Sequence, residues 1–278
     1  MRRLRAMTYN VRFADSSGSH DRWPARRDGV ASLVRFHAPD VVGFQEPRAG
    51  QREDLRESLP GYALVGRGRL ADGSGEGCPI AVRSDRWTVR DHDTFWLSET
   101  PEQPGAGWDG AHPRIVTWAR IVPSEAERDG DAGAFTVCNT HLDHRSARAR
   151  RRGAATLADR LATIAEGTPV VVLGDLNCRV GEEPHRILRG VADGTVESRE
   201  SDEDRPTVAL ADAVESAPVR HGPDTSLTDF RSLVMNRRID HVLVSEGIDV
   251  DAAATLADRD DRGRYPSDHL PVVVRLRV

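Results

Sequence analysis

The sequence predicts an α/β (α+β) fold in which two packed sheets are flanked by helices. Two observations lead to this prediction. Short apolar runs of strand length recur along the whole chain and are separated by turn signals rich in Gly, Pro, Asn and Asp. A few segments with helical periodicity lie between those runs, and no long Pro/Gly/Ser linker divides the chain. We therefore expect a single domain over residues 1–278.

The expected elements follow these patterns in order. Strands are predicted at residues 4–13, 41–46, 62–68, 79–84, 88–98, 116–122, 135–142, 170–177, 238–245 and 270–278. Helices are predicted at 24–37, 50–59 and 145–166. Two irregular stretches are expected to be loops: 99–115 is rich in Gly and Pro, and 192–207 is acidic and polar. Such loops carry substrate specificity or no function at all.

Composition excludes several classes of protein. No apolar run approaches the about 20 residues of a membrane-spanning helix, and the N-terminus has too short an apolar stretch for a signal peptide. We therefore expect a cytoplasmic protein, and nothing in the sequence implies a protein partner. All 39 basic residues are Arg, and the net charge of −5 argues against a dedicated duplex-DNA binder. The three cysteines lack metal-ligand spacing and are expected to be free thiols.

Polar side chains lie at the ends of several expected strands. They are Asn10, Glu46, His141, Asp175, Asn177, Asp240, His241, Asp268 and His269. Any one of them could be an ordinary turn former. Brought together at one edge, they would form a cleft of carboxylate, amide and imidazole groups. Hard oxygen ligands without cysteine suit Mg²⁺ or Mn²⁺ rather than Zn²⁺.

Six motifs, taken together and in this order, resemble a known superfamily. They are TYNVRF, GFQE, NTHLDHRS, GDLN, RIDHVLVS and SDHLPV. This set is similar to the endonuclease/exonuclease/phosphatase superfamily, which contains deoxyribonuclease-like, metal-dependent phosphoesterases. Segment 94–121 resembles a bacterial and archaeal subgroup nearest the deadenylases and nocturnin. The resemblance implies a four-layer αββα sandwich with two mostly antiparallel sheets, in agreement with the number of expected strands.

The resemblance also implies which residues bind the metal and which position the water. Glu46 matches the principal metal carboxylate, with Asn10 beside it and Asp268 contributing. Asp175 matches the residue that orients or deprotonates the attacking water, and Asn177 matches the residue that hydrogen-bonds the phosphate. The implied cofactor is Mg²⁺ or Mn²⁺.

Further roles fall to histidines and their partners. His269 matches the imidazole that stabilises the transition state, with Asp240 as the carboxylate that orients it, and His141 matches a second phosphate-facing imidazole. In related nucleases that second histidine pairs with a Glu seven residues before an Arg. Glu76 and Arg83 have this spacing, so Glu76 is expected to pair with His141 and to take part in catalysis.

The chemistry of phosphoesters accounts for this set of residues. A phosphoester resists attack because its oxygens are anionic and its leaving alkoxide is poor. A metal ion neutralises the anionic oxygens and stabilises the leaving alkoxide. A carboxylate positions the water, and imidazoles stabilise the charge that develops in the transition state. The predicted function is Mg²⁺- or Mn²⁺-dependent hydrolysis of a small or single-stranded phosphoester. A DNA- or RNA-directed nuclease is the alternative, with duplex DNA the less favoured substrate.

Four residues are candidates for substrate binding. Trp96, Trp108 and Arg114 lie in a segment that could border the cleft, where aromatic rings and one Arg suit a base or sugar with its phosphate. Each Trp could equally pack beneath the loop. Arg145 matches one of two phosphate-binding cations in deadenylase-like relatives, whereas Asp143 replaces the other. Asp143 would therefore repel a substrate phosphate or bind a metal.

The sequence leaves two features of this region open. His144 is either a further polar contact or a surface residue. Segment 145–154 concentrates five arginines, which could follow a nucleic-acid backbone or form a solvated helix face.

Overall fold

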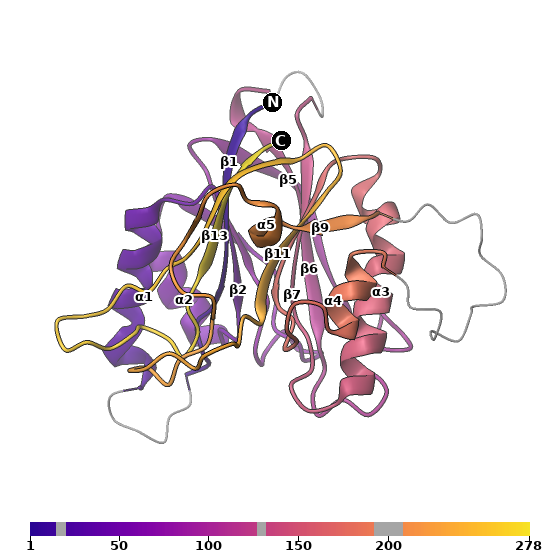
Figure 1. The fold of residues 1–278 in the computed structure, drawn as a ribbon. Coiled ribbons are helices and arrows are strands. Elements are labelled where there is room, and N and C mark those ends of the chain that lie inside the picture. Colours follow the sequence, from indigo (N-terminus) through magenta and orange to yellow (C-terminus); the bar gives the residue numbers. More distant parts are fainter. Residues whose placement is uncertain (15–20, 127–131, 192–207) are drawn as a thin grey trace.

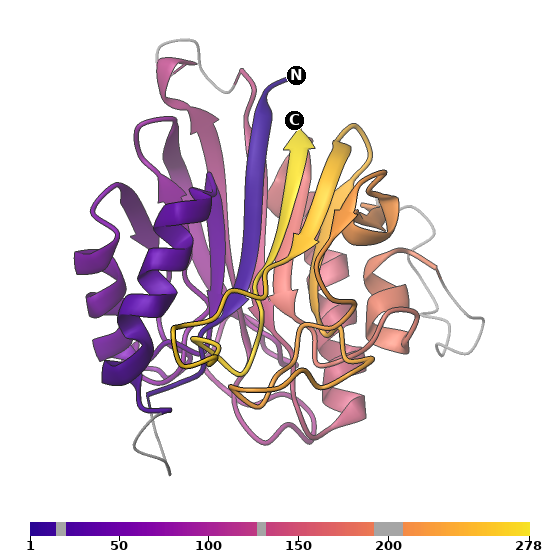
Figure 2. The same cartoon turned by 60° about the vertical axis from the view of Figure 1, so that its left-hand side comes forward.

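The computed structural model describes residues 1–14, 21–126, 132–191 and 208–278. Two sheets pack face to face, and helices lie against their outer faces (Figure 1 and Figure 2). This arrangement confirms the predicted sandwich. The loop expected at 192–207 lies outside the described residues.

The first sheet contains both ends of the chain. Its strands are β1 (Arg3–Asn10), β2 (Val41–Gln45), β3 (Tyr62–Val65), β4 (Ile80–Arg83), β10 (Arg220–His221), β12 (Asp249–Thr255) and β13 (Val272–Arg277). Their order is β10-β12-β13-β1-β2-β4-β3, and the neighbours β1 and β2 are parallel. Helices α1 (Trp23–His37) and α2 (Ala49–Ser58) cover its outer face (Figure 1).

The second sheet contains the middle of the chain. Its strands are β5 (Trp87–Trp96), β6 (Ile115–Pro123), β7 (Phe135–His141), β8 (Val170–Asp175), β9 (Leu210–Asp212) and β11 (Asp240–Ser245). Their order is β5-β6-β7-β8-β11-β9, and β7 and β8 are parallel. Helices α3 (Ala147–Ala165) and α4 (Glu183–Leu188) lie on its outer side (Figure 1). The short helices are η1 (Ser124–Ala126) and α5 (Ala213–Ser216).

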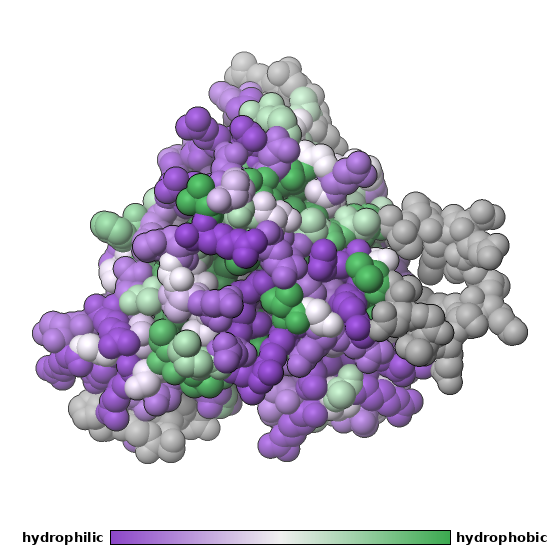
Figure 3. Space-filling model, in the orientation of Figure 1, coloured by the Kyte–Doolittle hydropathy of each residue, from purple (hydrophilic) through white to green (hydrophobic). Residues whose placement is uncertain are grey.

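Alternation along the strands builds the hydrophobic layers. In β1, Leu4 and Ala6 face the other sheet, whereas Met7 and Tyr9 face α1 and α2. On the opposite side, the apolar face of α3 packs on the second sheet through residues such as Leu157 and Leu161. The face seen in Figure 3 is mainly hydrophilic. Among the described helices, none combines the length and apolar character needed to cross a membrane.

The predicted elements match the structure closely where the hydrophobic pattern is strong. All three predicted helices are present, with ends that differ by one or two residues. Strands β9, β10 and β12, and the short helices, were not predicted. Segment 99–115 contains no helix or strand before β6 begins, as expected for a loop.

Strand direction brings the polar strand ends to one edge of the sandwich. Because β1 and β2 are parallel, their carboxyl ends lie side by side, with Asn10 opposite Gln45. In the second sheet the parallel pair β7 and β8 ends with His141 opposite Asp175. Strand β11 runs antiparallel to β8 and begins there, which places Asp240 opposite Asp175.

Candidate active site

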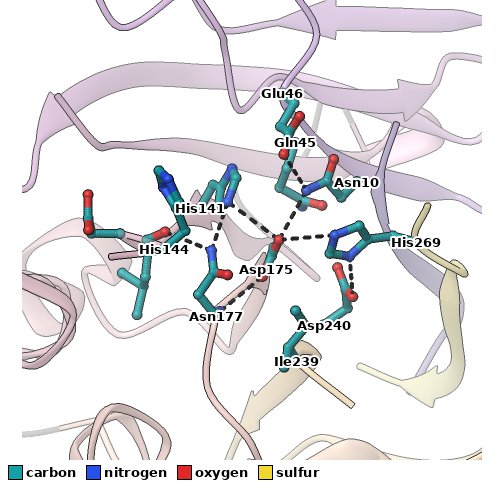
Figure 4. A network of polar contacts seen from close by, with 12 residues as sticks. Asn10, Gln45, Glu46, His141, His144, Asp175, Asn177, Ile239, Asp240 and His269 are labelled. Carbon is teal, nitrogen blue, oxygen red and sulfur yellow. Dashed lines mark hydrogen bonds and ion pairs between the residues drawn. The ribbon is translucent and has the colours of Figure 1, made fainter. Parts of the chain in front are cut away.

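The carboxylate of Asp175 lies at the centre of a buried polar network (Figure 4). Its Oδ2 accepts a hydrogen bond from Asn10 Nδ2 at 3.0 Å. The same oxygen lies 3.4 Å from His141 Nε2 and 3.7 Å from His269 Nε2. Its Oδ1 accepts the backbone N–H of Asn177 at 2.9 Å. Groups from both sheets therefore converge on one carboxylate.

The surroundings of Asp175 change its acidity. Burial and the nearby Asp240 carboxylate raise the pKa of Asp175 to about 7, although His269 acts in the opposite direction. A carboxyl group with a pKa near neutrality can accept a proton from water more readily than an ordinary aspartate. The structure thus places a candidate general base at the meeting point of the two sheets.

His269 is fixed by a carboxylate partner. Its Nδ1 lies 2.8 Å from Asp240 Oδ2, an arrangement that orients the ring. Burial alone would lower the pKa of His269, but the carboxylates of Asp240 and Asp175 overcome it and hold the pKa well above its usual value. The imidazole is therefore charged at neutral pH.

His141 has the opposite character. Burial, together with the positive charges of Arg114 and His269, holds the pKa of His141 well below its usual value. Asn177 Nδ2 lies 2.9 Å from His141 Nε2 and donates to the Leu142 carbonyl at 3.0 Å. The site therefore contains one charged and one neutral imidazole on either side of the central carboxylate.

Two further carboxylates lie on the first-sheet side of the site. Glu46 follows β2 directly, and its Oε1 and Oε2 accept hydrogen bonds from Asn10 Nδ2 at 3.0 Å and the Phe13 backbone N–H at 2.9 Å. Burial and the charge of Glu46 raise the pKa of Asp268, although Arg12 lies 3.7 Å from its Oδ2. Two neighbouring like charges of this kind suit a divalent cation, whose binding would remove their repulsion.

Asn10 links the two sides of the site. Its amide nitrogen contacts both Glu46 and Asp175, while its Oδ1 accepts the backbone N–H of Arg12 at 2.9 Å. In this orientation Asn10 connects the candidate metal carboxylate to the candidate base. A role as a direct metal ligand stays a prediction.

Comparison with known proteins decides the family. The model of the Endonuclease/Exonuclease/phosphatase family matches residues 7–269. The chain belongs to this family. An endonuclease/exonuclease/phosphatase family protein from Bacteroides thetaiotaomicron is 30% identical, with a TM-score of 0.86 and coverage of 99% of this chain and 97% of that one. A mannosyl-6-phosphatase from the same species is 30% identical, with a TM-score of 0.85 and coverage of 99% and 100%.

A curated relative matches more weakly. An uncharacterized protein from Acanthamoeba polyphaga mimivirus is 25% identical over 130 residues. That match covers 44% of this chain and 47% of the viral protein, so the chain spans about half the length of this relative.

Glu76 does not occupy the position expected for it in this family member. It lies in the loop between β3 and β4, and its Oε2 accepts a hydrogen bond from Arg69 Nη1 at 2.8 Å. The imidazole of His141 contacts Asn177 and Asp175 instead. The predicted pairing of Glu76 with His141 is therefore wrong. The spacing of seven to Arg83 requires a continuous strand, whereas β4 begins only at Ile80.

The two candidate aromatic residues lie in different surroundings. Trp96 is 4% exposed, packs against Cys78 and Ile115, and donates its indole N–H to the Arg69 carbonyl at 2.8 Å. Trp108 lines a hollow of about 620 Å³ together with residues of α3. Trp96 therefore packs beneath the loop, because a large apolar ring gains free energy from burial. Trp108 is partly exposed, and its role in substrate binding stays a prediction.

Arg114 lies near His141, and its role in substrate binding stays a prediction. Its side chain is buried, and its Nη2 lies 2.8 Å from His144 Nδ1. It is close enough to lower the pKa of His141, as described above. Arg145 is exposed just before α3, and its role in substrate binding stays a prediction.

Asp143 holds the turn that leads into α3. Its Oδ1 accepts the backbone N–H groups of Arg145 at 2.8 Å and Ser146 at 2.7 Å, and its Oδ2 accepts that of Ala111 at 3.2 Å. These bonds hold the start of α3 against the 99–115 loop. Asp143 therefore has a structural role, and the two roles expected from the sequence, repulsion of a substrate phosphate or metal binding, stay predictions.

Two residues near the site, His112 and Arg69, are not among those predicted from the sequence. The ring of His112 stacks on that of His144, with centroids 6.2 Å apart and an interplanar angle of 17°. Its position two residues before Arg114 could have indicated this. Arg69 has no comparable sequence signal, because only the folded loop brings it to Glu76.

A second buried cluster lies beside the site, between β9, β11 and α4. His185 Nε2 lies 2.9 Å from Asp212 Oδ2, and Arg238 Nη1 donates to the same oxygen at 3.0 Å. His241 Nδ1 lies 3.3 Å from it, and His241 Nε2 lies 2.9 Å from the Cys178 carbonyl oxygen. The cluster could present three metal-ligand atoms. Because Arg238 supplies a positive charge and these side chains already hydrogen-bond one another, the cluster fits a structural network better than a metal site.

We expect Asp212→Asn to destabilise the fold by about 3–5 kcal/mol, because it leaves the Arg238 cation buried without its carboxylate. The free energy of unfolding from urea titration at pH 7 measures this loss. Asp249→Asn, at a half-exposed carboxylate paired with Arg277, is the matched control and should cost less than about 1 kcal/mol. Equal effects of the two substitutions would contradict a structural role for the Asp212 network.

Proposed function

We propose that this protein is a Mg²⁺- or Mn²⁺-dependent phosphoester hydrolase that acts on a small phosphoester. The observation that carries this proposal is the position of Asp175, buried between one charged and one neutral imidazole and linked through Asn10 to Glu46. Such a centre can activate water, stabilise growing negative charge and hold a cation close together. Family members are phosphoester hydrolases, which supports the same reaction class.

Each side chain has a defined task in the proposed reaction. Asp175 would orient the attacking water and take its proton. The charged ring of His269, held by Asp240, would donate a hydrogen bond to the phosphate oxygens as their charge grows. His141 and Asn177 would bind phosphate oxygens from the other side. A cation held by Glu46 and Asp268 would neutralise the phosphate and stabilise the leaving alkoxide.

Two observations favour a small substrate over a long nucleic acid. Arginines of α3 are engaged within the protein: Arg150 Nη1 donates to the Asp143 carbonyl, and Arg151 lies 3.7 Å from Glu183. The similar Bacteroides protein is named as a mannosyl-6-phosphatase, an enzyme of small phosphoesters by its name. The net charge of −5 points in the same direction.

A substrate panel tests this function. Phosphate or alcohol release would be measured with sugar phosphates, nucleotides, bis-p-nitrophenyl phosphate, and single-stranded and duplex oligonucleotides, each with Mg²⁺, Mn²⁺ or EDTA. We expect metal-dependent turnover of small phosphoesters. Efficient duplex cleavage at about 150 mM salt, with the small phosphoesters untouched, would favour the nuclease alternative.

Glu46→Gln tests the metal assignment directly. The substitution keeps the shape of the side chain but removes its full negative charge, so we expect weaker Mn²⁺ binding by calorimetry and lower activity at limiting metal. Glu57→Gln, at an exposed position on α2, is the matched control. Unchanged Mn²⁺ affinity in Glu46→Gln would refute the assignment.

A further inference from the structure

Two ion pairs form a wall beside the proposed site, one in the loop between β3 and β4 and one from the segments before β6 and after β7. Arg69 Nη1 lies 2.8 Å from Glu76 Oε2, and Arg114 Nε lies 3.7 Å from Asp143 Oδ2. The four side chains are between 1% and 14% exposed, so these charges are largely removed from water. We refer to Arg69, Glu76, Arg114 and Asp143 as the paired wall.

The paired wall lies beside the proposed phosphate-binding groups. Val116 of β6 pairs with Thr140 of β7, so Arg114 lies just beyond that pair, at the same sheet edge as His141. Arg69 is held to this corner through the hydrogen bond from the Trp96 indole to its carbonyl. After burial, the charges of both arginines are among the causes that lower the pKa of His141.

The wall has hydrogen-bonding capacity that the protein does not use. Arg114 Nε is buried and has no hydrogen-bond acceptor in the part of the chain that the structure describes. A buried donor without a partner is unfavourable, so a ligand oxygen at this point would be stabilised. On the other pair, Arg69 uses only the Oε2 oxygen of Glu76. The wall can therefore offer both a donor and an acceptor.

The charge balance of the wall indicates what it can bind. Each guanidinium is neutralised by its own carboxylate, so the wall has no excess positive charge to offset a second phosphate. Next to it, burial and the nearby arginines lower the pKa values of His112 and His144, so both rings are neutral. Neutral imidazoles and ion pairs present donors and acceptors together, which is the pattern that hydroxyl groups match.

We propose, on the basis of the hydrolase function above, that the paired wall selects phosphate monoesters whose leaving group is a neutral polyol. The phosphate would lie against His141, Asn177 and His269. The polyol hydroxyls would lie against Arg69, Glu76 and Arg114. Sugars, cyclitols and glycerol share this chemistry, so the test must include one phosphate ester of each.

The first measurement compares kcat/KM across leaving groups in the presence of Mg²⁺. The arms are a hexose 6-phosphate, an inositol monophosphate, glycerol 3-phosphate, a hexose bisphosphate, a nucleoside diphosphate and p-nitrophenyl phosphate. We expect the wild-type protein to favour at least one polyol monophosphate over both doubly phosphorylated compounds. The polyol phosphate with the highest kcat/KM identifies the preferred polyol.

The second measurement changes the charge of one ion pair in both directions. Glu76→Gln leaves Arg69 unpaired, so the ratio of kcat/KM for the hexose bisphosphate to that for the hexose monophosphate should rise about tenfold. Arg69→Met leaves Glu76 unpaired, so the same ratio should fall about tenfold. Simple loss of structure would lower both rates without opposite changes in their ratio. Arg3→Met, at the far end of β1, is the control and should leave the ratio unchanged.

The outcomes separate this inference from the proposed function. Metal-dependent turnover of p-nitrophenyl phosphate or nucleotides, with polyol phosphates untouched, would leave the hydrolase function intact and overturn the polyol inference. Ratios that do not respond to Glu76→Gln and Arg69→Met would also overturn it. An absence of phosphate release from every arm, together with no turnover of bis-p-nitrophenyl phosphate or oligonucleotides in the substrate panel above, would overturn both.

Discussion

Asp175→Asn is expected to lower kcat by about 10⁴-fold, at the upper end of what a general base contributes. The amide keeps the size of the side chain but cannot accept a proton from water. It also removes one of the carboxylates that hold the pKa of His269 above its usual value, so a second group is weakened by the same change. Steady-state kinetics on the preferred phosphoester under saturating Mg²⁺ measure the loss.

The matched control for Asp175 is Asp28→Asn on α1, where the carboxylate is exposed. Thermal unfolding should show that both variants are folded. A kcat within tenfold of the wild-type value for Asp175→Asn would show that another group activates the water.

His269→Ala is expected to lower kcat by about 10²–10⁴-fold with little change in Mg²⁺ affinity. The charged ring acts on the phosphate as negative charge grows, whereas the proposed metal carboxylates remain in place. Asp240→Asn should lower kcat in the same direction but less, because it loosens the ring and reduces its charge without removing it.

The control for His269 is His221→Ala, which removes an exposed imidazole on β10. Calorimetric titration with Mg²⁺ separates loss of chemistry from loss of metal. Near-wild-type turnover in His269→Ala would indicate that the Asp240–His269 pair only stabilises the loop before β13.

The positions of the polar strand ends could be predicted because their causes are local. Asn10, His141 and Asp175 each end a strongly apolar strand, and parallel pairing brings such ends to the same edge. The two sheets pack face to face because each has an apolar inner surface. The convergence of these residues therefore follows from patterns that are visible in the sequence.

Other features depend on contacts that no local pattern encodes. A Trp in a Gly- and Pro-rich loop looks the same whether it faces the cleft or packs beneath it, so the positions of Trp96 and Trp108 could not be predicted. The loop that contains Glu76 turns through Gly73 and Gly75, both at positive φ, so a count of residues to Arg83 gave the wrong neighbour.

Strand β12 shows the same limit within the fold. Its sequence, DVDAAAT, is rich in alanine and has few of the β-branched residues that favour strands. It is a strand because β13 supplies a long antiparallel partner, with a register shift between Val250 and Ala252. Tertiary pairing outweighs the weak local preference here.

The division of the site between two sheets makes its geometry depend on their alignment. Asn10 ends a strand of the first sheet and Glu46 directly follows another, whereas His141 and Asp175 end strands of the second. Beneath them, Gln45 Nε2 donates to Asn139 Oδ1 at 2.7 Å, a buried cross-link between the layers. A sliding of one layer past the other by a single hydrogen-bond length would separate the proposed metal carboxylate from the proposed base. We therefore expect turnover to depend on the alignment of the two sheets. On heating, activity should be lost at a lower temperature than secondary structure.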